Sequence, residues 1–437
     1  MKKIFIILLI IFCSSSSFAD EKITSSDISG LSLEECLNIA LTNHPSLKKS
    51  KGAVRASRAA LEQTKSSNRV KVNLTSRTNF AGDYQTWDSR SASQMLGISA
   101  TKTLYDTGVN RLNREISMES LSGVLESERQ TQINVAAEAK KAYYDLVLKI
   151  LNRDVEREKL KNLEEHLITA KGLYEVGNSP FINVTKAEAD AATARVSLLK
   201  AENDILTSQE SLKVAMGVSD YEILDLMLST SLLLPKSAGE ISKILETAMN
   251  DRADYRKILH TLKQRELEIK AAARGNSPTI TGSIGTDWGK SEGSPTTTDY
   301  TVGVSVNVPV EDGGLTAAKI EAARAQLDQD LADEESLRQT IAHDLRSAAL
   351  TLTNAIERAK SSELSVQYAE ENLTLARGRY EVGVGDPLEI SDAVSTLASS
   401  RYTFYQALYD AQIARTNLDQ AMGHLPEELG VNNYGNN

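Results

Sequence analysis

The chain is built from two copies of one plan, and this repetition constrains its fold more than any other feature. Three landmarks recur after 206 positions: a YDTG or EDGG segment, a YEVG segment and a Met-Gly pair. Their last glycines are Gly108 and Gly314, Gly177 and Gly383, and Gly217 and Gly423. A constant offset predicts a duplicated unit of about half the 437 residues, with no net insertion between the landmarks.

Each copy contains a run too long for the helix of a compact globule. From Leu315 to Arg377 there is neither glycine nor proline, and the run from Val124 to Lys171 is similar. A continuous helix over the first run would be roughly 95 Å long at 1.5 Å per residue. Such lengths indicate a coiled coil or a helical array. Spacings of mostly four and seven predict a buried seam of Leu327, Leu331, Ile341, Leu345, Leu352 and Ile356.

Each long helix is expected to end in a turn that starts a shorter returning helix. The turns are 176–180 and 382–387, and both contain glycine and proline. Glycine suits the left-handed position after a helix, and proline suits the first residues of the next one. The returning helices end at Gly217 and Gly423, so each copy contains a long helical hairpin with a tight tip.

Shorter helices open the first copy, and their boundaries are marked by residue type. Ser32 followed by Glu35 fits a capping box, Pro45 interrupts the helix, and the helix resumes to about Ser67. The predicted organisation is a signal peptide (1–19), two repeats, a linker and a disordered tail. The repeats are 20–217 and 240–423, the linker is 218–239 and the tail is 424–437.

Two pairs of strands are expected where the apolar period changes to two. The alternating segments are 70–80, 96–101, 280–288 and 300–310. Each predicted strand has about ten residues, one apolar face and one polar face, which fits a tilted strand crossing a membrane. Phe80, Trp288 and Tyr300 stand at the loop-side ends, where an interfacial aromatic girdle would lie, and polar loops are expected at 83–92 and 289–299.

A shared barrel explains these strands better than a soluble sheet does. An ordinary antiparallel sheet with one buried face is the alternative, but a lone strand pair is marginal in water. Four strands per chain cannot close a barrel, so several chains must contribute to one.

The first residues have the pattern of a secretory signal. Lys2 and Lys3 precede an apolar stretch, and Ala19 ends a small-residue cleavage site. Cys13 raises the alternative of lipid attachment, which the bulky Phe12 before it disfavours. The predicted mature chain carries a net charge of −12, because two lysines are lost from a total of −10. This acidic balance argues against nucleic acid as a partner.

The residues that carry chemistry in enzymes are not arranged for it. Cys36 is the only cysteine after processing, so neither an internal disulfide nor a cysteine metal cluster can form. The five histidines lack metal-ligand spacing, and no phosphate-binding glycine loop or nucleophile elbow occurs. We therefore expect no catalytic residue, no cofactor, no metal site and no enzymatic activity.

With these features the chain resembles the TolC-like outer-membrane efflux protein family. The resemblance is carried by 31–47 (LSLEECLNIALTNHPSL), by Asp312 to Gly314 and by the two YEVG tips, and it covers nearly all of the mature chain. It implies an α+β membrane protein, a homotrimer in which long helices form an α-helical barrel and four strands per chain share one transmembrane β-barrel. The implied function is a passive outer-membrane duct for tripartite efflux or type I secretion, with its helical part in the periplasm.

The resemblance also implies partners and site residues. A periplasmic adaptor and an inner-membrane transporter would dock at the tips, through Val176, Gly177, Val382 and Gly383. Glu389 and Asp392 match an acidic ring that narrows the entrance, and Tyr380 matches an entrance-packing tyrosine. The polar latch of the family is not carried over, because its aspartate and arginine positions are here Asn183 and Gly385.

Alternatives remain for the tip residues and for the whole chain. Two exposed helix charges, and plain helix-ending turns, are the simpler interpretations of Glu389, Asp392 and the valine–glycine tips. The competing function is a soluble periplasmic coiled-coil adaptor or structural protein, for which one hairpin with compact β-domains, or unbroken heptads, would be expected. The exported substrate, the pump class and the mode of closure are not encoded in any recognisable motif.

Overall fold

The computed structural model describes residues 32–81, 91–218, 232–237, 241–291, 294–382 and 384–426. The predicted signal peptide, Gly383 of the second tip, most of the predicted linker and residues 427–437 lie outside these ranges.

The two copies repeat one another element by element. The first copy comprises α1 (Leu33–Asn43), α2 (Pro45–Ser66), β1 (Lys71–Ala81), β2 (Ser91–Tyr105), α3 (Val109–Glu175) and α4 (Phe181–Met216). The second comprises α5 (Ile241–Asp251), α6 (Ala253–Ala272), β3 (Thr279–Ser291), β4 (Thr297–Asn307), α7 (Leu315–Glu381) and α8 (Pro387–Met422). The two long helices have 67 residues each, and the two returning helices have 36 each.

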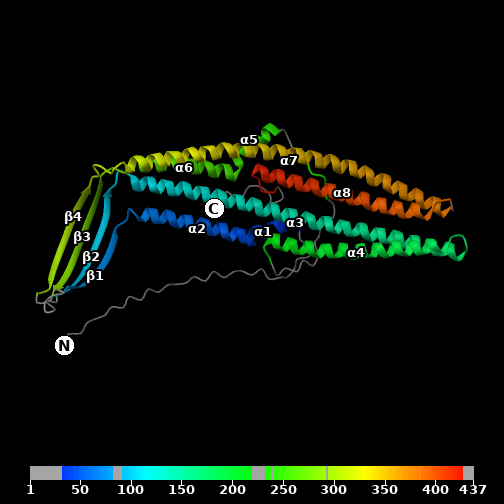
Figure 1. Cartoon of the computed structure of the whole chain (residues 1–437), viewed down its shortest axis with the longest axis horizontal. Helices are drawn as coiled ribbons and strands as arrows, with labels where there is room; N and C mark the ends of the chain where they lie inside the picture. Colours follow the sequence, from blue (N-terminus) through cyan, green and yellow to red (C-terminus); the bar gives the residue numbers. More distant parts are fainter. Residues whose placement is uncertain are drawn as a thin grey trace, which may run out of the picture.

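The molecule is long and thin, with the sheet at one end and the hairpin tips at the other (Figure 1). In the half near the tips, the helices form one layer in the order α7, α8, α3, α4. In the half near the sheet, the order is α7, α6, α3, α2. At about 1.5 Å per residue, the two long helices extend roughly 100 Å through both halves.

The returning helices α4 and α8 stack end to end with the shorter helices α2 and α6. Gly217 ends α4 with φ +71°, and a Cβ placed there would lie 2.6 Å from the Cα of His44, which caps α2. Gly423 ends α8 with φ +77°, and its Cβ would lie 2.9 Å from the Cα of Arg252, which precedes α6. Glycine is needed at both junctions for its left-handed backbone and its missing side chain. Each chain therefore contributes four helical columns.

Helix boundaries agree with the expected caps. The side chains and backbones of Ser32 and Glu35 form the reciprocal bonds of a capping box at the start of α1. Pro45 is the first residue of α2, and His44 caps that helix, because proline disfavours a helical conformation in the residue before it. The helix α3 begins at Val109, earlier than the glycine-free run indicated, and contains Gly123 and Gly172.

The predicted seam of α7 is confirmed over most of its length and wrong at one position. Ile341, Leu345, Leu352 and Ile356 are buried, but Leu331 is 46% exposed. Beside it, the carboxylate of Asp330 is buried and accepts a hydrogen bond from Arg265 of α6 at 2.8 Å. Near the sheet α7 packs on α6, whereas near the tips it packs on α8, so a different face of α7 is covered there.

The four strands form one antiparallel sheet in the order β1-β2-β3-β4, not two separate pairs. The expectation was wrong because β2 and β3, from different copies, pair along nearly their whole length. Pairing them leaves only β1 and β4 with an open edge. The strands also extend into the predicted loops, and β4 ends at Asn307, so Val308 and Val310 lie beyond it.

One face of this sheet is apolar and uncovered. Leu74, Ile98, Ile284 and Val302 share that face through the observed register, and Val302 is 80% exposed. Alternation of apolar and polar residues therefore occurs as predicted. None of the described helices is both long and apolar enough to cross a membrane.

Candidate functional site

The first tip is a tight turn closed by backbone hydrogen bonds. Val176 ends α3, Gly177 has φ +80°, and the N–H of Asn178 donates to the carbonyl of Leu173 at 2.8 Å. Proline was expected among the first residues of the returning helix. Pro180 instead caps α4 with an extended backbone, one residue before the helix begins at Phe181. The side chain of Val176 is 69% exposed, so this docking candidate lies on the surface.

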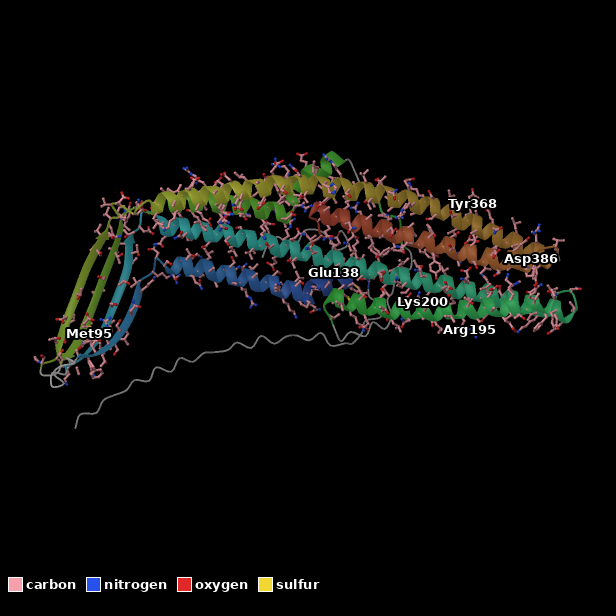
Figure 2. The ribbon with its side chains drawn as sticks, viewed as in Figure 1. Met95, Glu138, Arg195, Lys200, Tyr368 and Asp386 are labelled. Carbon is pink, nitrogen blue, oxygen red and sulfur yellow. The ribbon has the colours of Figure 1, made fainter. Side chains whose placement is uncertain are left out.

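The second tip reaches the same end of the molecule through different contacts. The N–H groups of Val384 and Gly385 both donate to the carbonyl of Arg379, at 3.0 and 2.9 Å. Asp386, labelled in Figure 2, accepts a hydrogen bond from the N–H of Leu388 and caps α8. A Cβ at Gly385 would lie 2.8 Å from the backbone nitrogen of Tyr380, so a larger residue would clash at this position. Val382 is also exposed, whereas Gly383 lies outside the described residues.

The two predicted ring carboxylates differ in their surroundings. Glu389 and Asp392 are both exposed in the first turns of α8. The carboxylate of Glu389 accepts a hydrogen bond from Nε of Arg379 at 3.2 Å. For Asp392, the described ranges contain no ion-pair partner. Sequence reasoning missed Arg379. Its positive charge offsets the negative charge of Glu389, one of the two predicted ring carboxylates.

Tyr380 lies where the two hairpins meet, and the entrance-packing role expected for it stays a prediction. It is 6% exposed, and its ring meets that of His166 from α3 edge-on, with the centroids 5.4 Å apart. Asn183, by contrast, donates to Ser179 within its own tip at 3.0 Å, so in this structure its amide forms a bond within its own hairpin. His166 was also missed, because a lone histidine on a charged helix gives no signal in the sequence.

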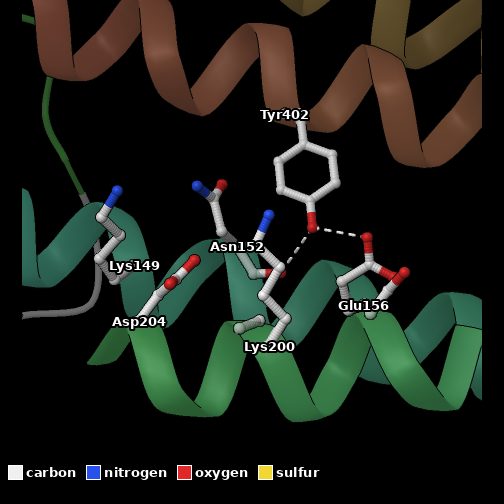
Figure 3. A pocket seen from close by; sticks show the side chains of 8 residues that line it. Lys149, Asn152, Glu156, Lys200, Asp204 and Tyr402 are labelled. Carbon is white, nitrogen blue, oxygen red and sulfur yellow. Dashed lines mark hydrogen bonds between the residues drawn. The ribbon is translucent and has the colours of Figure 1, made fainter. Parts of the chain in front are cut away.

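Further from the tips, the hairpins are joined by polar contacts around a cavity of about 230 Å³ between α3, α4 and α8 (Figure 3). Tyr402 of α8 donates to Glu156 of α3 at 2.7 Å. Burial and the Glu156 carboxylate raise the pKa of Tyr402, so the phenol stays protonated near neutral pH. Lys149, Lys200 and Asp204 also line the cavity. The mixed charges and the neutral phenol fit a structural tie between hairpins.

Metal ligation finds no support in the described part of the chain. Within it, no three His, Cys, Asp or Glu side chains are grouped closely enough to hold a metal ion.

Comparison with known proteins identifies this architecture. The sequence profile of the outer membrane efflux protein family matches residues 36–218 and 244–424, once in each copy. The chain belongs to the outer membrane efflux protein family. The antibiotic efflux pump outer membrane protein ArpC of Pseudomonas putida is 26% identical over 354 residues, covering 78% of this chain and 71% of ArpC. The outer membrane protein TolC of Vibrio cholerae is 23% identical, covering 92% of this chain and 93% of that protein.

The fold is shared with solved members of the family. The open state of the MtrE outer membrane channel of Neisseria gonorrhoeae superposes with a TM-score of 0.77 at 20% identity, over 90% of this chain and 89% of that one. The outer membrane efflux protein described here is therefore an outer-membrane duct with its helices in the periplasm. The alternative of a soluble adaptor or structural protein is not favoured, and the relatives are channel proteins.

Proposed function

We propose that three copies of this chain close into one passive tunnel and that a periplasmic adaptor and an inner-membrane efflux transporter dock at its hairpin tips. The observation that carries this proposal is that the single chain has complementary open edges on its two opposite sides. Head-to-tail contacts between such edges form a ring when the rotation from copy to copy closes.

One open edge is an apolar seam along α4. Its residues are exposed in the single chain and are spaced by three, four or seven positions, the pattern of a coiled-coil seam. The residues of the α4 seam are Ile182, Ala189, Ala192, Val196, Leu199 and Leu206.

The opposite edge of the helical layer has a matching seam along α7. Tyr368 of α7 and Arg195 of α4 lie on the two sides of the layer in Figure 2. Spacings of four, seven and fourteen again follow the heptad. The residues of the α7 seam are Leu350, Leu364, Tyr368 and Leu375, all of them more than half exposed.

The two seams lie at the same height along the helices. Arg195 of α4 and Arg377 of α7 both reach α3, where they contact the adjacent carboxylates of Glu164 and Glu165 at 2.7 and 3.5 Å. Rotation about an axis parallel to the helices does not change height. Val196, next to Arg195, and Leu375, two positions before Arg377, are therefore at the same height. We expect Val196 of one copy to face Leu375 of the next.

The sheet has the same arrangement of free edges. β1 and β4 are its outer strands, and an even number of antiparallel strands makes the β4 of one copy antiparallel to the β1 of the next. Three chains then supply twelve strands, and the uncovered apolar face of Val302 and its neighbours is placed against lipid.

Docking at the tips is supported by their exposure and position. Val176, Val382 and Val384 are each more than two-thirds exposed at the end of the molecule opposite the sheet. ArpC is named as part of an antibiotic efflux pump, which is the kind of assembly we propose for this chain. The duct carries out no reaction, so the choice of substrate belongs to the transporter that docks on it.

Photo-crosslinking in living cells tests the docking. A photoreactive residue is placed at Asn178 or at Val384, and matched controls carry it at exposed positions of the same hairpins that lie far from the tips and outside the two seams, Glu202 and Arg346. We expect the tip positions alone to capture an adaptor, with its transporter copurifying. Capture of the same proteins from the control positions, or of no protein by an intact outer-membrane trimer, would contradict docking at the tips.

A further inference from the structure

A buried histidine lies at the contact between the two hairpins, next to the tips. His166 of α3 and Tyr380 of α7 are each 6% exposed, and their rings meet edge-on. The Nδ1 atom of His166 and the hydroxyl of Tyr380 are both buried, and neither has a hydrogen-bond partner among the described residues. Two unsatisfied polar atoms in one apolar contact are costly, so this part of the interface is held less firmly than its burial suggests.

Most of the material around this pair is apolar. The cluster that contains Tyr380 draws residues from all four helices of the tip half. Its members include Leu163, Ala191, Ala194, Leu373, Ile390, Val394 and Leu397. A neutral imidazole is tolerated in such surroundings, whereas an imidazolium would be poorly hydrated and its Nδ1–H would have no carboxylate to bond to among the described residues.

The charged groups that act on His166 come from α4, and no hydrogen bond joins a charged side chain to its Nδ1 among the described residues. From α4, Asp190 favours the protonated imidazole and Lys186 opposes it. Asp190 itself accepts a hydrogen bond from Ser391 of α8 at 2.7 Å, and the carboxylates at the start of α8 are exposed. From α7, Arg377 is engaged by Asn162 and Glu165 of α3.

The balance of these influences has a definite sign. Burial lowers the pKa of His166, with Asp190 opposing and Lys186 adding to the effect. If the hairpins separate and water reaches the ring, the pKa returns toward its ordinary value of about 6.5. The separated state then binds the proton more tightly. Its population must therefore rise as the pH falls below about 6.5, and it must level off below the pKa of the packed state.

We propose that His166 is a proton-sensitive contact that sets the separation of the two tips. When neutral, it packs against Tyr380 and holds the hairpins together; when protonated, it releases them. The consequence for the tunnel rests on the proposed function, in which the tips form the entrance, but tip separation is a property of the chain itself. The position 206 residues later is Asn372, exposed on α7, so the duplication supplies this contact only once per chain.

Distance measurements between the tips test the proposal. Spin labels are attached to Asn178→Cys and Val384→Cys in the full-length protein, with labelled subunits diluted among unlabelled ones so that distances within one chain dominate. The native Cys36 is fully buried, and burial raises the pKa of its thiol to about 12, so it should remain unlabelled. Pulsed electron paramagnetic resonance then gives the packed and separated populations from pH 8 to pH 5.

We expect the ratio of separated to packed tips to rise about tenfold for each unit by which the two pKa values differ. His166→Gln should make the ratio independent of pH, whereas the matched control His343→Gln, at an exposed position of α7, should keep the response. Lys186→Gln, also at an exposed position, removes a charge that opposes protonation and should shift the midpoint to higher pH.

Three results would overturn the proposal: a pH-independent ratio in the native protein, an unchanged response in His166→Gln, or a downward shift of the midpoint in Lys186→Gln. The Lys186 variant keeps the test decisive even if the buried substitution prevents folding. Because no partner is present in this measurement, failure of docking at the tips would appear only in the photo-crosslinking experiment.

Discussion

The two hairpins of the chain have the same backbone and differ at their tips. Their helices have equal lengths, and both returning helices end at a left-handed glycine, Gly217 or Gly423. Near the tips, however, the equivalent tyrosines differ in burial. Tyr174 is 46% exposed and packs on Phe181, whereas Tyr380 is buried against the first hairpin. The duplication thus gives both hairpins the same backbone. Only Tyr380 of the two equivalent tyrosines takes part in the contact between the hairpins.

Charge diverges at the same places. In the first turns of α4 the first hairpin has Asn183 and Lys186, and 206 positions later the second has Glu389 and Asp392. The backbone needs the same caps and glycines in both copies, so those residues cannot diverge without cost. The side chains at these positions do not supply the helix caps or the turn glycines, and it is there that the two hairpins differ in charge.

The largest expected difference is at the tyrosines. Tyr380→Ala should destabilise the tip half by about 3 kcal/mol, because it empties a buried aromatic site, whereas Tyr174→Ala should cost less than about 1 kcal/mol. Hydrogen exchange of backbone amides in α7 and α8 measures this local stability. Equal losses for both variants would show that the two tyrosines have equivalent roles after all.

At positions where the two copies have the same structure, equivalent substitutions should have the same effect on stability. Gly217→Ala and Gly423→Ala should each cost about 2 kcal/mol, since both impose a left-handed backbone on alanine and push a Cβ into a neighbouring helix start. Gly52→Ala is the control, because nothing lies near its Cβ position in α2, and it should stabilise by up to about 1 kcal/mol. Thermal unfolding of the purified trimer followed by circular dichroism compares the three. A tolerated change at either junction would contradict end-to-end stacking of the helices.

The charge difference predicts an asymmetric electrostatic effect. Replacing both Glu389 and Asp392 by Ala should raise the concentration of a trivalent cation needed to block single-channel current by about tenfold, because carboxylates around a narrow axis concentrate cations. The matching double variant of Asn183 and Lys186 should not weaken block. Unchanged block in the first variant would leave these carboxylates as ordinary exposed helix charges.

The smallest expected effect concerns Arg379, which pairs with Glu389. Arg379→Gln removes an exposed ion pair, so stability should change by less than about 1 kcal/mol. Cation block should strengthen about twofold, because one carboxylate per chain loses its counter-charge. Single-channel recordings over a cation titration measure it, and weaker block than in the native protein would argue against a role for Arg379 in offsetting the ring.

Much of the fold follows from local sequence rules. The repeat at 206 positions, the capping box at Ser32 and Glu35, the break at Pro45 and the glycine ends of the helices each depend on backbone requirements that single residues satisfy. The predictions failed where distant segments decide. Leu331 is exposed because α7 changes partner from α8 to α6, and the joined sheet depends on pairing between strands of different copies.

The candidate site could be located from the sequence but not described. The YEVG tips predicted where the hairpins turn, and the position of Tyr380 followed from the family resemblance. The partners of these residues did not follow: Arg379 beside Glu389, and His166 beside Tyr380, come from other turns or other helices. Such contacts depend on how two hairpins pack in three dimensions, and no local pattern in the chain encodes them. The roles assigned to Val176, Gly177, Val382 and Gly383 in docking remain predictions.

The claim that the chain closes head to tail into a tunnel is tested most directly by one disulfide. The double variant Val196→Cys and Leu375→Cys places thiols on opposite edges of a chain, too far apart to pair within it, and each single variant is a control. The account predicts disulfide-linked trimers under mild oxidation of outer membranes, and the same for Leu206→Cys with Leu364→Cys, which lie at matching heights. Monomers from both pairs, or linked products from a mismatched pair such as Val196→Cys with Leu350→Cys, would contradict it.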